Sequence, residues 1–137
     1  MSARMTSAEF ARLTGASRSK FNVGDAAART WRDKVYASGA EMRYAQVLQR
    51  SLDAGLVTFF AEQPTFMLGD DTRFKPDFVV GQIEPPHLSA VDVKGAETRE
   101  FKRIKGLWSK YAKIPLLVVR ERRGGGFALI ETVGGAP

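Results

Sequence analysis

The sequence contains no cysteine, no long apolar run and no apolar leader. Without cysteine it can form neither a disulfide framework nor a thiolate zinc site. No segment approaches the roughly 18 consecutive apolar residues that a membrane-spanning helix needs. The first twenty residues also lack the apolar central stretch of a secretory signal. These absences favour a cytoplasmic protein with no membrane partner.

The length and the charge of the chain point to one basic domain. At 137 residues we expect a single folded domain over residues 23–137, preceded by a flexible N-terminal arm over residues 1–22. The formal net charge is +6, and a basic protein attracts polyanions. Basic side chains are concentrated in residues 18–34 and 99–113. Nucleic acid is therefore the expected partner, although a basic stretch can also be only a solvated surface.

Periodicity predicts two helices and several strands. Apolar residues at helical spacing predict helices over residues 38–54, with Ser38 as N-cap and Gly55 as the stop, and over residues 98–112, with Trp108 and Tyr111 as core anchors. Strand-like runs cover residues 56–63, 64–68, 73–81, 88–95, 114–121 and 127–133, and His87 falls in the loop over residues 82–87. This order predicts an α/β fold whose central mixed β-sheet is flanked by helices.

Two of the predicted strands each carry an aspartate. Asp77 follows Pro76 within one run, and Asp92 stands two residues before Lys94 in the next, so Asp92 and Lys94 share a face of an extended strand. If the two runs form a hairpin, Asp77 comes to lie beside Asp92. Two adjacent carboxylates repel each other unless a cation lies between them, and hard oxygen ligands suit Mg²⁺ or Mn²⁺. Lys94 would then orient a metal-bound water or stabilise a phosphate. A bound metal ion with such a lysine is an arrangement that can hydrolyse a phosphodiester.

Pro76-Asp77 and Asp92-Val93-Lys94 resemble the motif of the PD-(D/E)XK nuclease superfamily. More narrowly, residues 19–119 are similar to small phage-encoded nucleases of that superfamily, through "SKFN", "SGAE", "EQP" and "VDVKG", whereas residues 23–35 are richer in alanine and basic residues than that pattern. The resemblance implies a restriction-endonuclease-like core. It also implies four catalytic residues, namely Glu41, Asp77, Asp92 and Lys94, and a metal site formed by Glu41, Asp77, Asp92 and the carbonyl of Val93.

The same resemblance implies a metal-dependent endodeoxyribonuclease that needs Mg²⁺ or Mn²⁺ and no small-molecule cofactor. Small members of the superfamily without an added recognition domain usually cut branched DNA such as Holliday junctions, and they do so as homodimers. The basic helix that follows the lysine would supply phosphate contacts, and the three candidates are Lys102, Arg103 and Lys105. Gln63, in "EQP", is a candidate for a supporting position beside the metal ligands.

Each of these residues also has a simpler interpretation. Ser38 and Glu41 have the spacing of a capping box, in which the glutamate only satisfies the start of a helix. Asp77 fits a turn, Asp92 and Lys94 fit an exposed ion pair, and Gln63 fits the polar end of a strand. The basic helix can be a solvated face. For the whole chain, the alternatives are a nucleic-acid-binding module that does not cut and a protein-interaction role, for which no residue gives support.

Overall fold

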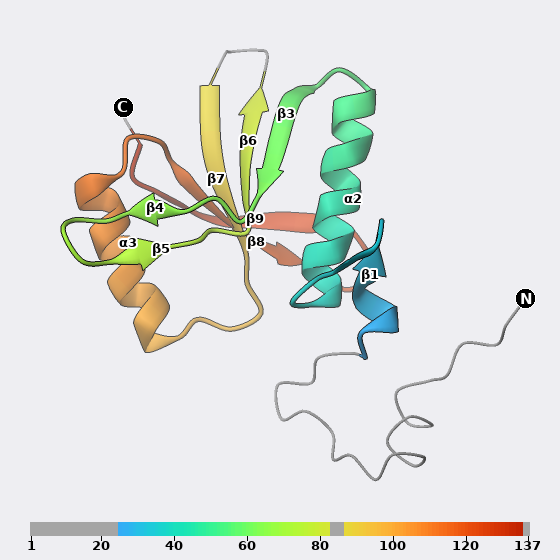
Figure 1. Cartoon of the computed structure of the whole chain (residues 1–137), viewed down its shortest axis with the longest axis horizontal. Helices are drawn as coiled ribbons and strands as arrows, with labels where there is room; N and C mark the ends of the chain where they lie inside the picture. The colour runs from blue at the N-terminus through green and yellow to red at the C-terminus, as the bar shows by residue number, and fades with distance from the viewer. Residues whose placement is uncertain (1–24, 83–86, 136–137) are drawn as a thin grey trace, which may run out of the picture. The chain divides into compact units, whose positions relative to one another are not determined.

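The computed structural model describes residues 25–82 and 87–135. The chain divides into two compact units, Met1–Gln46 and Val47–Pro137, whose helices and strands are labelled in Figure 1. The predicted arm over residues 1–22 and the loop residues 83–86 lie outside the described part. No helix within the described part is long and apolar enough to cross a membrane.

The described part of the first unit holds a short hairpin and the start of a helix. A 3₁₀ turn, η1 (Ala27–Arg29), leads into β1 (Thr30–Trp31) and β2 (Lys34–Val35), which pair antiparallel around a two-residue turn. Helix α2 (Gly39–Asp53) begins here and ends in the second unit.

Helix α2 has the boundaries that the sequence predicts. The Ser38 hydroxyl accepts a hydrogen bond from the Glu41 N–H at 3.1 Å, which caps the first turn. The helix stops before Gly55, whose φ of +77° is a left-handed conformation that glycine adopts without steric cost.

The second unit is built on a five-stranded mixed sheet, which confirms the α/β prediction. Its strand order is β3 (Val57–Glu62), β6 (Phe78–Gln82), β7 (His87–Val93), β8 (Leu116–Glu121) and β9 (Phe127–Val133). All neighbours are antiparallel except β7 and β8. Parallel neighbours need a crossover connection, and α3 (Arg99–Tyr111) supplies it. His87, expected in a loop, is instead the first residue of β7 and pairs with Gln82.

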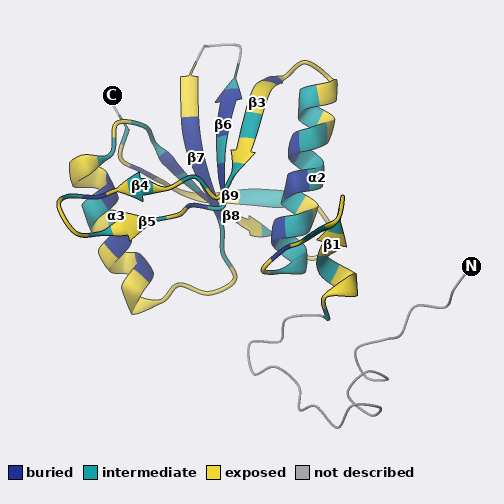
Figure 2. Cartoon of the chain, in the orientation of Figure 1, coloured by how far each residue is buried: buried dark blue, intermediate teal, exposed yellow. Residues whose placement is uncertain are grey.

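Helix α3 closes the core on one face of this sheet. Thr98 caps its start by accepting from the Phe101 N–H at 3.1 Å. The helix buries Phe101, Ile104 and Trp108 in a cluster with Ala90, Leu116, Val118 and Val133 of the sheet (Figure 2). Trp108 is fully buried, as predicted, and its indole N–H donates to the Ile114 carbonyl at 2.8 Å.

The prediction for Tyr111 is wrong. Its side chain is 44% exposed rather than buried in the core. The ring lies over Gly69, where an added Cβ would be 3.2 Å from Tyr111 Cε2. Tyr111 is the last residue of α3, and the apolar spacing that fits the helix does not fix the burial of its final turn.

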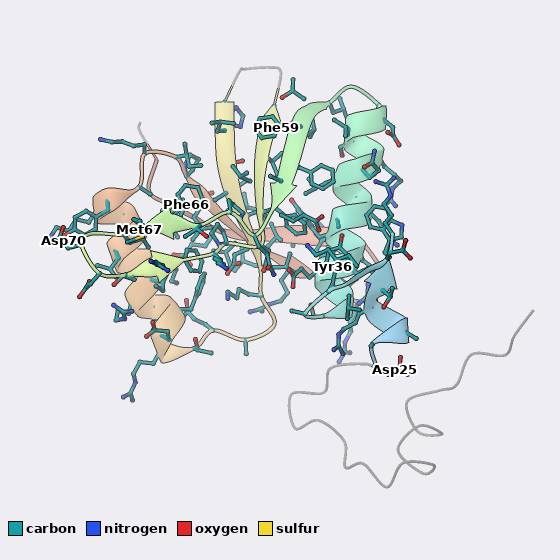
Figure 3. The ribbon with its side chains drawn as sticks, in the orientation of Figure 1. Asp25, Tyr36, Phe59, Phe66, Met67 and Asp70 are labelled. Carbon is teal, nitrogen blue, oxygen red and sulfur yellow. The ribbon has the colours of Figure 1, made fainter. Side chains whose placement is uncertain are left out.

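The run over residues 73–81, expected as one strand, is divided at Pro76. Its first part is β5 (Arg73–Phe74), which pairs with β4 (Phe66–Met67) in a separate two-stranded sheet. The rings of Phe66 and Phe74 lie 4.8 and 6.0 Å from the ring of Trp108. The hairpin therefore packs on α3, and Figure 3 labels Phe66 and Met67 on its first strand. Pro76 has no N–H for a ladder, which is why the strand breaks there and β6 starts again within the central sheet.

Candidate functional site

The structure brings Asp77 and Asp92 together at the adjoining ends of β6 and β7. The last ladder pair of these strands is Phe78 with Val91, and the two aspartates are the next residues outward. The Asp77 N–H donates to Asp92 Oδ1 at 3.1 Å, and the Val93 N–H donates to Asp77 Oδ2 at 2.7 Å. Each carboxylate thus bonds the backbone of the opposite strand. These reciprocal bonds, here called the aspartate brace, continue the ladder beyond its last backbone pair.

One oxygen of the brace lacks a well-directed partner. Asp92 is 2% exposed, and its Oδ2 accepts no hydrogen bond within the described residues. The Lys94 ammonium lies 2.8 Å from this oxygen, so the two form an ion pair, but its direction does not satisfy hydrogen-bond angles. A buried carboxylate oxygen is costly unless a cation compensates it. The position therefore suits a positive charge, which here is the lysine.

Lys94 is placed by contacts on both sides of its side chain. Its backbone N–H continues the β7–β8 pairing by donating to the Val119 carbonyl at 2.9 Å. Its ammonium lies 4.2 Å from the centroid of the Phe101 ring, and the side chain is 29% exposed. The cation thus lies between a buried carboxylate and a buried aromatic ring while part of the side chain still reaches solvent.

Gln63 reaches the brace through its backbone. Its N–H donates to the Asp77 carbonyl at 2.9 Å, just beyond the end of β3. Its φ of +50° is uncommon for a residue other than glycine. The side chain itself is exposed. Gln63 therefore contacts Asp77 through its peptide group, and its supporting role beside metal ligands stays a prediction.

The third predicted acid belongs to the other unit. Glu41 is 5% exposed and lies in the first turn of α2, where its N–H is capped by Ser38. Within residues 25–82 and 87–135, no group of three or more His, Asp or Glu side chains has a metal-binding arrangement. The second unit therefore assembles Asp77, Asp92, Val93 and Lys94, and the metal-ligand role of Glu41 stays a prediction.

The basic face of α3 is more strongly paired than its sequence indicates. Two hydrogen bonds join Arg103 to Glu100. Lys105 is 17% exposed and pairs with both Glu131 and Glu97, which raises the pKa of its ammonium. Lys102 is the open member, with a side chain that is 68% exposed and lies 4.0 Å from a Glu97 oxygen.

Beside Lys94 lies a pocket of about 180 Å³, here called the Lys94 pocket. Its walls come from the loop before α3, from α3 itself and from strands β8 and β9; the lining residues are Lys94, Glu97, Phe101, Lys105, Val118, Arg120, Ile130 and Glu131. Arg120 is a basic residue of this region that the sequence analysis missed. The alternation of β8 was the available signal, because it places Arg120 on the same face as Val118.

No protein-family model, curated protein or solved structure matches this chain. Its function is therefore inferred from the geometry of the site.

Proposed function

We propose that this protein is a metal-dependent endodeoxyribonuclease with a restriction-endonuclease-like core. The aspartate brace is the observation that carries the proposal. It fixes two carboxylates at adjacent strand ends, with the Lys94 ammonium 2.8 Å from one of them. A buried carboxylate oxygen whose near neighbour is a cation is an arrangement that a divalent metal site uses.

The donor set fits Mg²⁺ or Mn²⁺. Asp77, Asp92 and the Val93 carbonyl are all hard oxygen donors, and Asp92 Oδ2, which lies beside the Lys94 ammonium, is a buried oxygen that accepts no hydrogen bond within the described residues. Such an ion, when bound, supplies an activated water and neutralises phosphate charge. Lys94 would donate hydrogen bonds to that water or to the phosphate oxygens as negative charge builds up on them. The Gln63 N–H holds the Asp77 backbone, and hence the direction of its carboxylate.

The proposed substrate is branched DNA such as a Holliday junction, and the proposed active species is a homodimer. The net charge of +6 favours a polyanion. One site hydrolyses one phosphodiester, whereas resolving a junction requires two symmetric cuts, which a two-fold dimer provides. We therefore expect a four-way junction to be cut faster than linear duplex, single strand or flap DNA.

Mg²⁺-dependent nicking of a supercoiled plasmid tests the catalytic proposal. Asp77→Asn and Asp92→Asn should each abolish nicking, because asparagine keeps one acceptor oxygen for the brace but loses the charge that holds the ion. DNA binding should persist in both variants. Asp70→Asn is the matched control, since Asp70 is an exposed acid of the same unit outside the brace. If either brace variant nicks the plasmid at the wild-type rate, the proposed site is wrong.

A non-cleaving nucleic-acid-binding module is the second candidate. One oxygen of each aspartate is already committed to a backbone N–H, and Lys94 neutralises Asp92, so the brace can also act only as a strand-end staple. This candidate predicts that the wild-type protein binds DNA and leaves every substrate of the junction panel intact with Mg²⁺ and with Mn²⁺.

A further inference from the structure

The Lys94 pocket owes part of its shape to an irregularity in β9. Val118 pairs with Glu131, but Val119 pairs with Leu129, so Ile130 is an extra residue on the β9 side. Consecutive residues of a regular strand face opposite sides, whereas a bulge turns an additional side chain. Ile130 and Glu131 accordingly both line the pocket. Bulges are frequent beside binding sites, where they re-aim a side chain.

The charges around the pocket are unevenly compensated. Lys105 pairs with two glutamates, Glu97 and Glu131, so this part of the wall has one positive and two negative side chains and attracts no anion by itself. Arg120, by contrast, is exposed and makes no ion pair with any carboxylate of residues 25–82 and 87–135. Within the described residues Lys94 pairs with one carboxylate, that of Asp92, and Asp92 also belongs to the proposed cation site. Once a divalent cation compensates Asp92, Lys94 and Arg120 are the two cations left to act on a ligand in the pocket.

The apolar part of the pocket does not suit a stacked base. Phe101 is 4% exposed, and the ammonium groups of Lys94 and Lys105 lie 4.2 and 5.6 Å from its ring centroid. Its ring is therefore not open to a nucleobase. Ile130, which is 50% exposed, gives the pocket an aliphatic edge instead. A small anion attached to an aliphatic group matches this lining better than a flat aromatic ligand does.

We propose that the Lys94 pocket binds a second phosphate of the DNA strand, with its deoxyribose against Ile130 and its oxygens toward Arg120. This inference rests on the proposed nuclease function, since the Lys94 ammonium touches Asp92 on one side and lines the pocket on the other. The phosphate in the pocket is thus a neighbour of the one that is hydrolysed. Arg120 serves as the binding residue, because a guanidinium matches phosphate geometry with two parallel hydrogen bonds.

Two pairs of variants of the full chain test this assignment. Arg120→Gln should reduce the dependence of duplex DNA binding on salt by about one unit of slope, measured without divalent ions. With Mg²⁺ it should raise KM about tenfold while kcat stays near the wild-type value, as expected for a contact that binds substrate and transition state alike. Its matched control is Lys113→Gln, which also removes one positive charge. Lys113 follows the C-terminal end of α3, whereas the pocket lies beside the N-terminal half of this helix.

The second pair changes size instead of charge. Ile130→Trp should obstruct the pocket and raise KM as Arg120→Gln does. Leu129→Trp is its control, because Leu129 is the preceding residue of the same strand, is 59% exposed and does not line the pocket. Both side chains are exposed, so both variants should fold, and thermal unfolding verifies this.

The outcomes separate the two proposals. If Arg120→Gln and Ile130→Trp both keep the wild-type KM and salt slope, the phosphate site is wrong. The nuclease proposal still holds in that case, provided that the wild-type protein cuts DNA. Equal effects of Ile130→Trp and Leu129→Trp would also overturn the phosphate site, since the pocket would then not be what matters. A wild-type protein that cuts no DNA overturns the nuclease. In that case, a lower salt slope in Arg120→Gln than in Lys113→Gln still supports the pocket as a phosphate site of a binding module.

Discussion

Replacing Lys94 by methionine should strengthen metal binding and abolish cleavage. The Lys94 ammonium lies 2.8 Å from Asp92 Oδ2, so an ion held by this oxygen has a positive neighbour. Two unit charges 4 Å apart interact by about 4 kcal/mol at an effective dielectric constant of about 20, and a divalent ion doubles the repulsion. Because the lysine side chain is 29% exposed, it can withdraw from the ion, which leaves a smaller cost. We expect about 1–2 kcal/mol, or roughly 5–30-fold tighter binding.

Titration calorimetry with Mn²⁺ in the absence of DNA measures the first effect, and plasmid nicking measures the second. Methionine retains a flexible apolar chain that can remain against Phe101. Lys113→Met is the control, because it removes the same charge from an exposed side chain that follows α3 and should leave both readouts unchanged. Mn²⁺ affinity at or below the wild-type value would refute the competition for Asp92. Nicking at the wild-type rate would show that Lys94 takes no part in the hydrolysis.

Three further predictions concern stability. The hydrogen bond from Lys105 lowers the pKa of Glu97 below its ordinary value of 4.5, so the ion pair stabilises the folded state at pH values above 4.5. The difference in Tm between the wild type and Glu97→Gln should therefore shrink as the pH falls below 4.5. Arg32 has a φ of +54° in the β1–β2 turn, and Arg32→Asn should raise Tm by about 2 °C because asparagine tolerates this conformation; an unchanged or lower Tm would contradict the strain. Trp108→Ala should cost about 3–5 kcal/mol in urea unfolding, since the indole is fully buried; a loss below about 1 kcal/mol would contradict its role in the core.

The neighbouring aspartates could be predicted because their positions depend on local rules. Side chains in a strand alternate between its two faces, and the short loop between residues 73–81 and 88–95 favours a hairpin. These rules were enough to place Asp77 beside Asp92, and the structure bears this out, because the Asp77 N–H donates to Asp92 and the Val93 N–H donates to Asp77. Helix α2 was predictable for the same reason, since its cap and its stop lie within its own sequence.

Features that depend on distant partners could not be predicted in this way. The sequence presents Lys105 as part of a basic helix, yet Glu131 of β9 pairs with it at 2.8 Å, and no local pattern reveals a partner 26 residues away. The division of residues 73–81 has a similar cause. Pro76 indicates that the strand can break, but the sequence does not show where β5 lies. The packing of Phe66 and Phe74 on Trp108 shows this.

The brace also explains how two strand ends can hold a site with little rotational freedom. Asp77 Oδ2 and Asp92 Oδ1 are fixed by backbone N–H groups of the opposite strand, so the direction of each carboxylate follows from the register of β6 on β7. A site held in this way loses little conformational entropy when a ligand binds. The same dependence makes it sensitive to register, because a slip of one residue would turn each side chain to the other face of the sheet. Pro76, buried two residues before the first residue of β6, opposes a slip that would bring it into the ladder, because it has no N–H to donate. The residue that breaks the strand thereby helps to position the acid that follows it.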